Sequence, residues 1–455
     1  MSMEPRTSGA GVLRPGSQAA EPGSPAELLS RLETFGIRLG LDSMRGLLAA
    51  AGRPDRSLPV VLVAGTNGKG STASLLASIC RGAGYRTGLY TSPHLETFGE
   101  RIQVDGDAID DGQLARWIGR AVDLARDRGL ETPTVFEAIT FAAVSHFHQR
   151  DVDIAILEVG LGGRLDATNA CEPLVSVITP IGLDHQAYLG DSLEAIAGEK
   201  AHVLRPGRPL VAWADEAEVE RVFTDRCAAA GAHYLPAHGL VHFEPLGDHR
   251  YRARTPQTTH ILTVPLPGPH QLQNLALGIL AAEALGEAGF QRLDGDAVVR
   301  GVSGWRWPGR LEWVHLPGGH RILLDVAHNP AGVAALVDYL ESSPEGAAGS
   351  SRLHVLFGAL EDKDVSSMLP AIAGLAHRLI LTRPPGPRGG DPEAWRPLLE
   401  AQCPGIEVEP RPEAALDLAL RDLRPSEPLV ICGSVALVGL LRGELRSHFG
   451  VPGPV

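Results

Sequence analysis

Long apolar runs and an excess of basic residues are both missing from this chain. No stretch approaches the roughly 20 apolar residues of a membrane-spanning helix, and the N-terminus lacks the continuous apolar segment of a secretion signal. The 41 Lys and Arg are outnumbered by 54 Asp and Glu, which gives a net charge of −13. A general nucleic-acid-binding surface needs positive charge. We therefore expect no membrane and no nucleic-acid partner, although one positive loop could still bind an anionic small substrate.

Cysteine is scarce, and its spacing excludes the usual cysteine-based scaffolds. The five cysteines form no CxxC pair and lie at Cys80, Cys171, Cys227, Cys403 and Cys432. An odd, scattered set fits reduced thiols better than a disulfide framework or a zinc site. The pattern predicts a cytoplasmic protein.

A glycine-rich loop between a strand and a helix is the most informative segment. Residues 60–64 are apolar and mostly β-branched, residues 65–71 read GTNGKGS, and a helical pattern resumes at Thr72. Backbone N–H groups at a helix N-terminus favour a phosphate, which Gly68 and Gly70 would let approach closely. Lys69 could then reach the outer phosphates, and Ser71 could offer its hydroxyl to Mg²⁺. The strict P-loop pattern is not met, so a plain glycine-rich turn remains the alternative.

Polar residues stand at the ends of three predicted strands. Ser92 follows the strand at 86–91, Glu158 lies in the apolar strand at 154–160, and His185 lies just beyond the strand at 174–179. Ligands of open α/β sheets bind at the carboxyl ends of strands. A buried Glu is costly without a partner, so Glu158 suggests either a divalent cation or a structural ion pair. Spacing alone would not make His185 a Mg²⁺ ligand, because Mg²⁺ prefers oxygen.

The length of 455 residues suggests two or three domains. We expect a disordered tail at 1–25, which is rich in Gly, Pro, Ser and Ala, a central domain at 26–305 that carries the glycine-rich loop, and a second domain at 306–455. A helix is predicted over 134–148 and antiparallel strands over 232–265. A second strand–helix series is predicted, with strands at 322–326, 353–357, 378–381 and 429–432 and helices at 331–340, 365–376 and 414–420. Strands alternating with helices predict an α/β fold: a P-loop-type parallel-sheet ATPase domain followed by a smaller Rossmann-like domain.

Eight motifs occur in a characteristic order along the chain. They are GTNGKGS at 65–71, SPHL at 92–95, LEVGLGGRLDATN at 157–169, ITPIGLDH at 178–185, GEKA at 198–201, GPHQLQN at 268–274, PGRLE at 308–312 and DVAHNPAG at 325–332. Together they make residues 26–455 resemble the folylpolyglutamate synthase/dihydrofolate synthase family of the Mur ligase superfamily. The resemblance implies an ATP-dependent amide ligase that adds L-glutamate to a folate-type carboxylate, either dihydropteroate or a reduced folate, through an acyl phosphate. It also implies that 26–305 is the central ATP-binding domain and 306–455 the C-terminal glutamate-ligase domain.

The resemblance also implies site residues. The implied nucleotide-binding positions are Gly68, Lys69, Gly70, Ser71, Asn274, Arg310 and Asp325. The implied Mg²⁺ ligands, for one or two ions, are Ser71, Ser92, Glu158 and His185. The implied pterin-side positions are Thr134, Val135, Phe136, Glu137, Leu165, Asp166 and Ala167. Lys69, His328 and Lys200 are the implied catalytic residues, with Lys200 carbamylated, and a monovalent cation and a monomeric chain are expected.

Two departures from the family pattern are visible. His202 stands where the family often has Gly, and Val326 replaces a frequent Gly before Ala327. Neither removes an implied ligand, but His202 could alter helix packing near the metal site. Two other functions stay open at this point: a Mur-type ligase that acts on a UDP-muramoyl precursor, and a nucleotide-binding switch without ligase activity.

Overall fold

The computed structural model describes residues 23–32, 38–343, 353–399, 405–421, 423–425 and 427–450. Nearly all of the tail expected at 1–25 therefore lies outside the described residues. Within the described part, no helix is both long and apolar enough to cross a membrane. Cys80, Cys171, Cys227 and Cys432 are buried free thiols.

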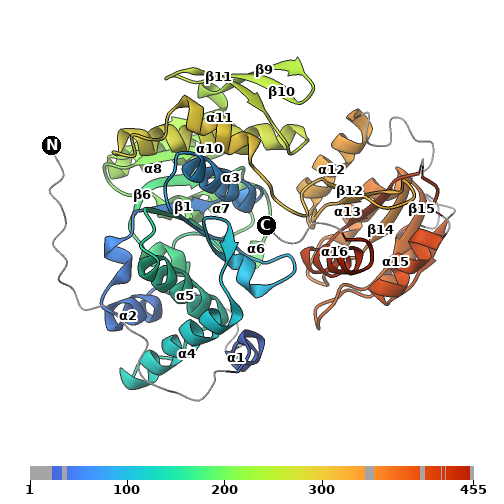
Figure 1. Cartoon of the computed structure of the whole chain (residues 1–455), viewed down its shortest axis with the longest axis horizontal. Helices are drawn as coiled ribbons and strands as arrows, with labels where there is room; N and C mark the ends of the chain where they lie inside the picture. Colours follow the sequence, from blue (N-terminus) through green and yellow to red (C-terminus); the bar gives the residue numbers. More distant parts are fainter. Residues whose placement is uncertain are drawn as a thin grey trace.

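An eight-stranded sheet organises the first part of the described chain (Figure 1). Its strands run in the order β4-β3-β2-β5-β1-β6-β7-β8. Their bounds are β1 (Val60–Ala64), β2 (Thr87–Tyr90), β3 (Ile102–Val104), β4 (Asp107–Ala108), β5 (Ile154–Glu158), β6 (Pro173–Ile178), β7 (Pro209–Ala212) and β8 (His233–Pro236). β1 pairs in parallel with β5 and β6 at the centre, whereas β3 and β4 are antiparallel at one edge. The predicted mostly parallel sheet is confirmed.

Helices cover both faces of this sheet, as predicted (Figure 1). Residues 60, 62 and 64 of β1 pack into one apolar cluster and residues 61 and 63 into the other, because side chains alternate along a strand. The first cluster includes α1 (Pro25–Leu32), α2 (Asp42–Ala50), α4 (Asp111–Asp127), α5 (Val135–Gln149), α6 (Gln186–Leu189), α7 (Leu193–Lys200) and α8 (Ala217–Ala230). The second includes α3 (Lys69–Gly82), α9 (Ala237–Leu240), α10 (Pro269–Glu287) and α11 (Gly295–Ser303).

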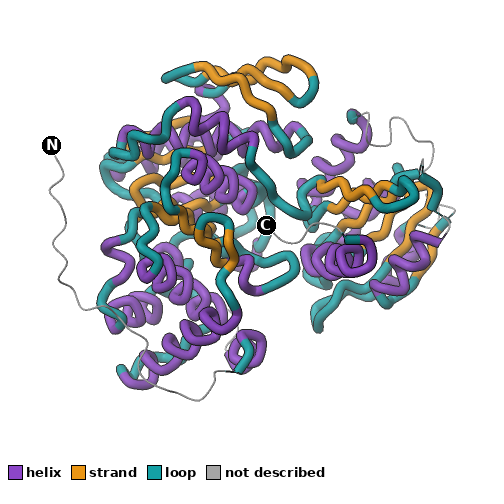
Figure 2. Tube along the Cα trace, viewed as in Figure 1, coloured by secondary structure: helices purple, strands orange, loops and turns teal. Residues whose placement is uncertain are grey.

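The segment predicted to be antiparallel over 232–265 is only partly so. β8 joins the main sheet in parallel with β7. The antiparallel part is a separate three-stranded sheet of β9 (His242–Gly247), β10 (Arg250–Arg254) and β11 (Thr259–Thr263), which lies outside the main sheet (Figure 2). The alternation of apolar and polar residues is the same for either direction of pairing, so it could not distinguish the two.

A smaller α/β unit follows. Its six described strands run in the order β12-β13-β17-β14-β15-β16 and are parallel except for β12. The strands are β12 (Glu312–His315), β13 (Arg321–Leu324), β14 (Leu353–Phe357), β15 (Ala376–Leu381), β16 (Ile406–Val408) and β17 (Leu429–Cys432). The helices are α12 (Pro330–Ser342), α13 (Val365–Ala373), α14 (Pro392–Trp395), α15 (Pro412–Arg421) and α16 (Val435–Phe449). The expected boundary at 305/306 falls between α11 and β12 and stays a prediction.

Two glycines bring α3, the helix after the glycine-rich loop, against α11. A Cβ at Gly82 would lie 2.9 Å from the carbonyl oxygen of Ala297, and one at Gly301 would lie 2.7 Å from the backbone nitrogen of Ile79. Both distances are shorter than ordinary packing permits, so each helix backbone rests directly on the other. The position of the loop helix therefore depends on the absence of side chains at this crossing.

We predict that Gly301→Ala destabilises the fold by about 1–3 kcal/mol, because the methyl group must push α3 away. Gly119→Ala in α4 is the matched control, since its Cβ would meet nothing within 4 Å. It should stabilise by up to about 1 kcal/mol through helix propensity. Urea unfolding of both variants measures the difference. Equal effects of the two substitutions would contradict the close-packing argument.

Candidate active site

The glycine-rich loop delivers the start of α3 to the carboxyl edge of the sheet. Gly68 adopts a left-handed conformation with φ 84°, and α3 begins at Lys69. The helix thus starts three residues earlier than the predicted Thr72, because the turn at Gly68 already directs the chain into it. The N–H groups of this first turn lack intrahelical partners and can bind an anion. Lys69 Nζ donates to the carbonyl oxygen of Thr66 at 3.1 Å, beside that turn.

Asn274, at the start of α10, lies against the loop. Thr72 Oγ1 donates to Asn274 Oδ1 at 3.2 Å, and Asn274 Nδ2 donates to Gln271 Oε1 at 2.9 Å. A Cβ at Gly68 would overlap the Asn274 amide oxygen. The structure therefore brings Asn274 and Gly68 together, as the expected nucleotide site requires, and explains why a side chain at position 68 would not fit.

Glu158 is a buried carboxylate at the end of β5. It accepts the backbone N–H of Ser92 at 2.9 Å, and a Cβ at Gly70 would lie 3.3 Å from its Oε2. Burial raises its pKa above the ordinary range, while Lys69 and Arg310 act in the opposite direction. A carboxylate that is buried at a cost and faces the loop fits a divalent cation, whose charge would favour the ionised form.

The other expected metal ligands contribute unequally to this fit. Ser71 is buried in the first turn of α3, next to Gly70. His185 has a left-handed backbone with φ 53°, a half-exposed side chain, and its Nε2 4.0 Å from Asp184 Oδ2. Among the described residues, no three His, Cys, Asp or Glu side chains gather into a cluster that could hold a metal. The structure thus places Glu158 and Ser71 beside the loop, and the metal-ligand roles of Ser71, Ser92, Glu158 and His185 stay predictions.

Lys200, the last residue of α7, points at the loop. It is buried, and its Nζ donates to the carbonyl oxygen of Gly65 at 2.5 Å. Burial, helped by the charge of Lys69, lowers the pKa of Lys200 to about 7. A large fraction of this amine is therefore uncharged near neutral pH, and an uncharged amine is a nucleophile.

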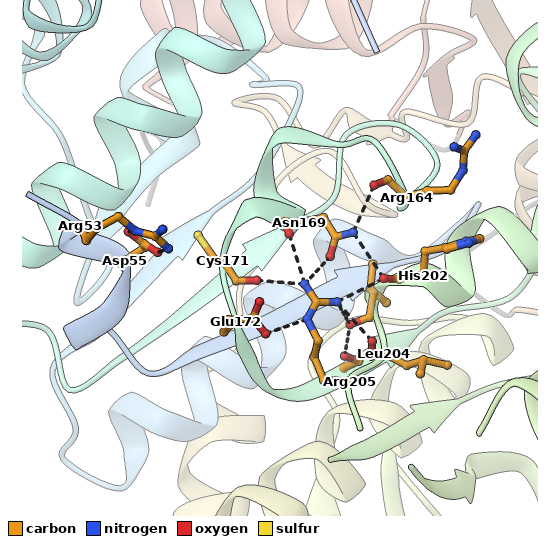
Figure 3. Close-up of polar contacts among 11 residues, drawn as sticks. Arg53, Asp55, Arg164, Asn169, Cys171, Glu172, His202, Leu204 and Arg205 are labelled. Atoms are coloured by element: carbon orange, nitrogen blue, oxygen red, sulfur yellow. Dashed lines mark hydrogen bonds and ion pairs between the residues drawn. The ribbon is translucent and has the colours of Figure 1, made fainter. Parts of the chain in front are cut away.

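A hub centred on Arg205 fixes the chain just beyond Lys200 (Figure 3). The guanidinium donates to backbone carbonyls on both sides of it, with Nη1 at 3.2 Å from those of His202, Val203 and Leu204 and Nη2 at 3.2 Å from those of Asn169 and Cys171. Asn169 in turn donates through Nδ2 to the carbonyl of His202 at 3.3 Å. The departure at His202 is thus accommodated inside this hub, where its Nδ1 lies 2.9 Å from the Gly198 carbonyl.

The two segments expected on the pterin side meet at Gly160. The ring of Phe136 lies 2.6 Å from where a Cβ of Gly160 would be, and Asp166 Oδ2 lies 3.3 Å from the same point. Thr134 and Glu137 form a capping box at the start of α5, and Glu137 also pairs with Arg38 at 2.7 Å. The remaining positions expected on the pterin side, Val135, Leu165 and Ala167, are adjacent in sequence to these residues.

Asp166 holds the loop after β5 in shape. Its carboxylate accepts the N–H groups of Gly160 at 3.0 Å and Leu161 at 2.9 Å, and the hydroxyl of Thr168 at 2.6 Å. Burial raises its pKa, and these hydrogen bonds act against that rise. The carboxylates of Asp166 and Glu137 are thus already bonded within the protein, so any contact with a substrate would be additional.

The segment 304–311, here called the joint, connects the first α/β part to the second and carries Arg310. Asp325, just after β13, lies against it. Asp325 accepts the N–H groups of Leu311 and Ala327 at 2.8 and 2.9 Å, which fixes the turn containing Arg310. Burial raises the pKa of Asp325, and Arg310 opposes this rise. Burial lowers the pKa of His328 to about 4, and its Nδ1 lies 2.9 Å from the Val326 carbonyl. His328 is therefore neutral, with the proton on Nδ1 and Nε2 left as an acceptor.

Two further contacts join the two parts of the chain, through residues that were not predicted to belong to the site. Asn329 Nδ2 donates to Asn67 Oδ1 at 2.9 Å, and Lys363 Nζ lies 3.4 Å from Asp184 Oδ1. Burial raises the pKa of Asp184, but Lys363 and His185 outweigh it and the net pKa is lowered. A signal for Lys363 was available in the composition: only three of the 41 basic residues are lysines, Lys69, Lys200 and Lys363, and all three reach this edge.

A glycine-rich loop on a parallel sheet, completed by groups from a second α/β unit, is the arrangement of a Mur ligase, and two Mur ligase domain models match the chain. The Mur ligase middle domain matches residues 63–282, and the Mur ligase glutamate ligase domain matches residues 309–435. A dihydrofolate synthase/folylpolyglutamate synthase of Bacillus subtilis is 37% identical over 357 residues, which cover 76% of this chain and 81% of that protein. The structure of E. coli FolC in complex with DHPP and ADP is 30% identical with a TM-score of 0.85, and the match covers 95% of this chain and all of that one.

The chain therefore belongs to the folylpolyglutamate synthase/dihydrofolate synthase family, as the motifs indicated. A further similar structure is a bifunctional folylpolyglutamate synthase/dihydrofolate synthase with Mn, AMPPNP and L-glutamate bound, at 29% identity and a TM-score of 0.82, which covers 94% of this chain and all of that one. These matches favour the folate-family function over the cell-wall and switch alternatives.

We predict that Glu158→Gln stabilises the protein in the absence of nucleotide. Because burial raises the pKa of Glu158 above its ordinary 4.5, the stability linked to its proton is full below pH 4.5 and is lost as the pH rises through the folded pKa. Gln stays neutral, so the variant should match the parent at low pH and exceed it at pH 7. Urea unfolding across this range measures the difference.

The same variant should no longer gain thermal stability from ADP with Mg²⁺, because the charge that would bind the cation is gone. Glu413→Gln, at an exposed position of α15, is the control and should behave like the parent in both tests. A Glu158→Gln variant that is less stable than the parent at pH 7 would contradict this account.

Proposed function

We propose that this chain is an ATP-dependent ligase that joins L-glutamate to the carboxylate of a folate-type acceptor, with ADP and phosphate as the other products. The observation that carries the proposal is the buried Glu158 carboxylate against Gly70 at the start of α3, where the charges of Lys69 and of Arg310 from the joint both act on it. This arrangement suits a charged triphosphate bound between two lobes. The similar structures whose bound molecules are ADP, AMPPNP and L-glutamate support it.

The chemistry follows from the poor reactivity of a carboxylate. An acceptor carboxylate oxygen attacks the γ-phosphorus, and the bond to the bridging oxygen breaks to release ADP. The α-amine of glutamate then attacks the acyl carbon, phosphate leaves with the C–O electron pair, and the amine loses a proton. The first-turn N–H groups and Lys69 hold the phosphates, and Arg310 balances their growing charge. Bound Mg²⁺ would neutralise the phosphate oxygens beside Glu158.

His328 has a role that its neutral state suggests. Its Nε2 is an acceptor, because Nδ1 donates to the Val326 carbonyl. We propose that Nε2 orients the amine of glutamate by accepting one of its N–H groups. The low pKa of about 4 keeps the imidazole from becoming a cation that would repel an ammonium group. Positioning of this kind contributes mainly by holding the nucleophile near the acyl carbon.

The acceptor is proposed to be dihydropteroate, a reduced folate, or both in turn, since the names of several relatives include both activities. We predict that the purified protein converts each active acceptor to a product heavier by one glutamyl residue, only when ATP, Mg²⁺ and L-glutamate are all present. Mass spectrometry of reactions with dihydropteroate and with tetrahydrofolate measures this. A UDP-muramoyl acceptor is the control and should give no adduct. Product from that control alone would overturn the proposal.

We also propose that Lys200 is carbamylated. The uncharged amine attacks CO₂, a C–N bond forms, and a proton leaves, so that a cation becomes a carboxylate-like anion. The lowered pKa of about 7 and the aim of Nζ at Gly65 support this. A carbamate at this position would add a negative charge beside the phosphates, where a cation could bridge to it.

We predict that Lys200→Ala lowers kcat by about 100-fold, as loss of a group that orients a metal site does, and that acetate or propionate restores part of it. Lys200→Arg keeps the charge but cannot form the carbamate, and it should not respond to added carboxylate. Carbon-13 NMR after addition of labelled bicarbonate should show a carbamate signal in the parent only. A fully active Lys200→Ala variant would refute this role.

Several finer expectations remain proposals on the same basis. They are one or two Mg²⁺ ions, a monovalent cation, the ligand set Ser71, Ser92, Glu158 and His185, the pterin-side positions at 134–137 and 165–167, a monomeric chain and a cytoplasmic location.

A further inference from the structure

The loop from Ser92 to Thr97 begins at the carboxyl edge of the main sheet, next to Glu158. Its first residue donates its N–H to Glu158 Oε2 at 2.9 Å. Farther along, the carboxylate of Glu100 accepts the N–H groups of Leu95, Glu96 and Thr97 at 2.8, 3.0 and 2.7 Å. The loop is thereby held at both ends, with little freedom to change shape independently of the sheet.

The tip of the same loop is built into the second domain. Leu95 packs against the apolar cluster that α16 forms with the second sheet. Gly439 of α16 lies so close beneath the Leu95 carbonyl that a Cβ would overlap it. The side chain of Glu96 points into the same contact and is only 5% exposed.

Arg442 of α16 bridges Glu96 to a second carboxylate. Its Nη1 hydrogen-bonds to Glu96 Oε1, and its Nη2 and Nε lie 2.9 and 3.0–3.1 Å from the carboxylate oxygens of Glu312. Arg446 completes the group with Nη2 at 2.7 Å from Glu96 Oε2. The side chain of Arg442 is 2% exposed, which makes it among the most buried charges in the described structure.

Glu312 connects Arg442 to the turn that carries Arg310. Its Oε2 accepts the N–H of Gly309 at 2.8 Å, inside the turn that carries Arg310. Gly309 in turn accepts the N–H of Val326 through its carbonyl at 2.9 Å, next to Asp325. Arg442 and Arg310 also border one cavity of about 70 Å³, together with Pro93, His94 and Trp307.

Removal of Arg442 would therefore have two consequences. Glu312 would lose its guanidinium partner and the buried Glu96 would keep only Arg446, and breaking a buried charge pair is strongly unfavourable. The loop of Ser92 and the turn of Arg310 would also lose the group that fixes both of them relative to α16. Since the two segments belong to different parts of the chain, no shared secondary structure would replace that link.

We propose that Arg442 is a positioning residue, which holds the Ser92 loop and the Arg310 turn in the arrangement that bound nucleotide requires. This rests on the proposed function only in placing the nucleotide at residues 65–71. Arg442 itself is not proposed to touch the nucleotide, and it acts through Glu96 and Glu312.

The test is calorimetric titration of the full-length protein with ADP and Mg²⁺. Arg442→Gln should bind at least about tenfold more weakly than the parent, which corresponds to the loss of about 1.4 kcal/mol. Arg411→Gln is the matched control in the same domain, since Arg411 is exposed and pairs with Glu409, and it should bind like the parent. The titration needs no acceptor, so a wrong acceptor assignment would leave this result unchanged.

Glu96→Gln provides a second route to the same contact if Arg442→Gln does not fold. It should weaken binding in the same direction, and the double variant should bind no more weakly than Arg442→Gln, because both substitutions break one link. A merely structural role would lower the melting temperature and leave the ADP affinity of the folded protein unchanged. Folded Arg442→Gln or Glu96→Gln that binds ADP within twofold of the parent would overturn the proposal.

Discussion

A carboxylate buried at the end of a central strand is the constraint on which this site depends. Glu158 lies at the carboxyl end of β5, against the first turn of α3, and burial makes its ionised form costly. The charges of Lys69 and Arg310 reduce that cost only in part, so the pKa stays raised. A glycine at position 70 lets the first turn of α3 approach this carboxylate, the N–H of Ser92 donates to it, and the charge of Arg310 acts on it. Each of these features brings positive charge or an N–H group to the same pair of oxygens.

The second domain contributes to this edge through three different kinds of contact. Asn67 and Asn329 form a neutral amide hydrogen bond, Lys363 and Asp184 form a partly buried ion pair, and Arg442 joins two carboxylates deep in the interface. The first two lie at the glycine-rich loop and at the strand end near His185, whereas the third lies beside the turn that carries Arg310. A substrate between the lobes would therefore be enclosed by interdomain contacts of different strength, which suits an enzyme that must admit and release nucleotide.

The parts of the structure that were predictable from sequence are those with local signals. The buried strand β1, the glycine-rich loop and α5 follow from residues close together in the chain, and the order of the eight motifs indicated the family. The parallel pairing of β8, by contrast, depends on a partner strand rather than on its own pattern. The link between Glu96 and Arg442 joins residues 346 positions apart, and in the sequence an Arg in α16 resembles any solvated charge. The helix start at Lys69 was missed because Gly68 supplies the turn by its own left-handed backbone.

The distribution of amines has a consequence for chemical labelling. Because all of the other Lys/Arg positions hold arginine, the chain offers side-chain amines only at Lys69, Lys200 and Lys363. An acylating reagent that reacts with amines and spares guanidinium groups is thus confined, among side chains, to the neighbourhood of the glycine-rich loop. The extent of acylation then becomes a direct measure of how far that neighbourhood is shielded.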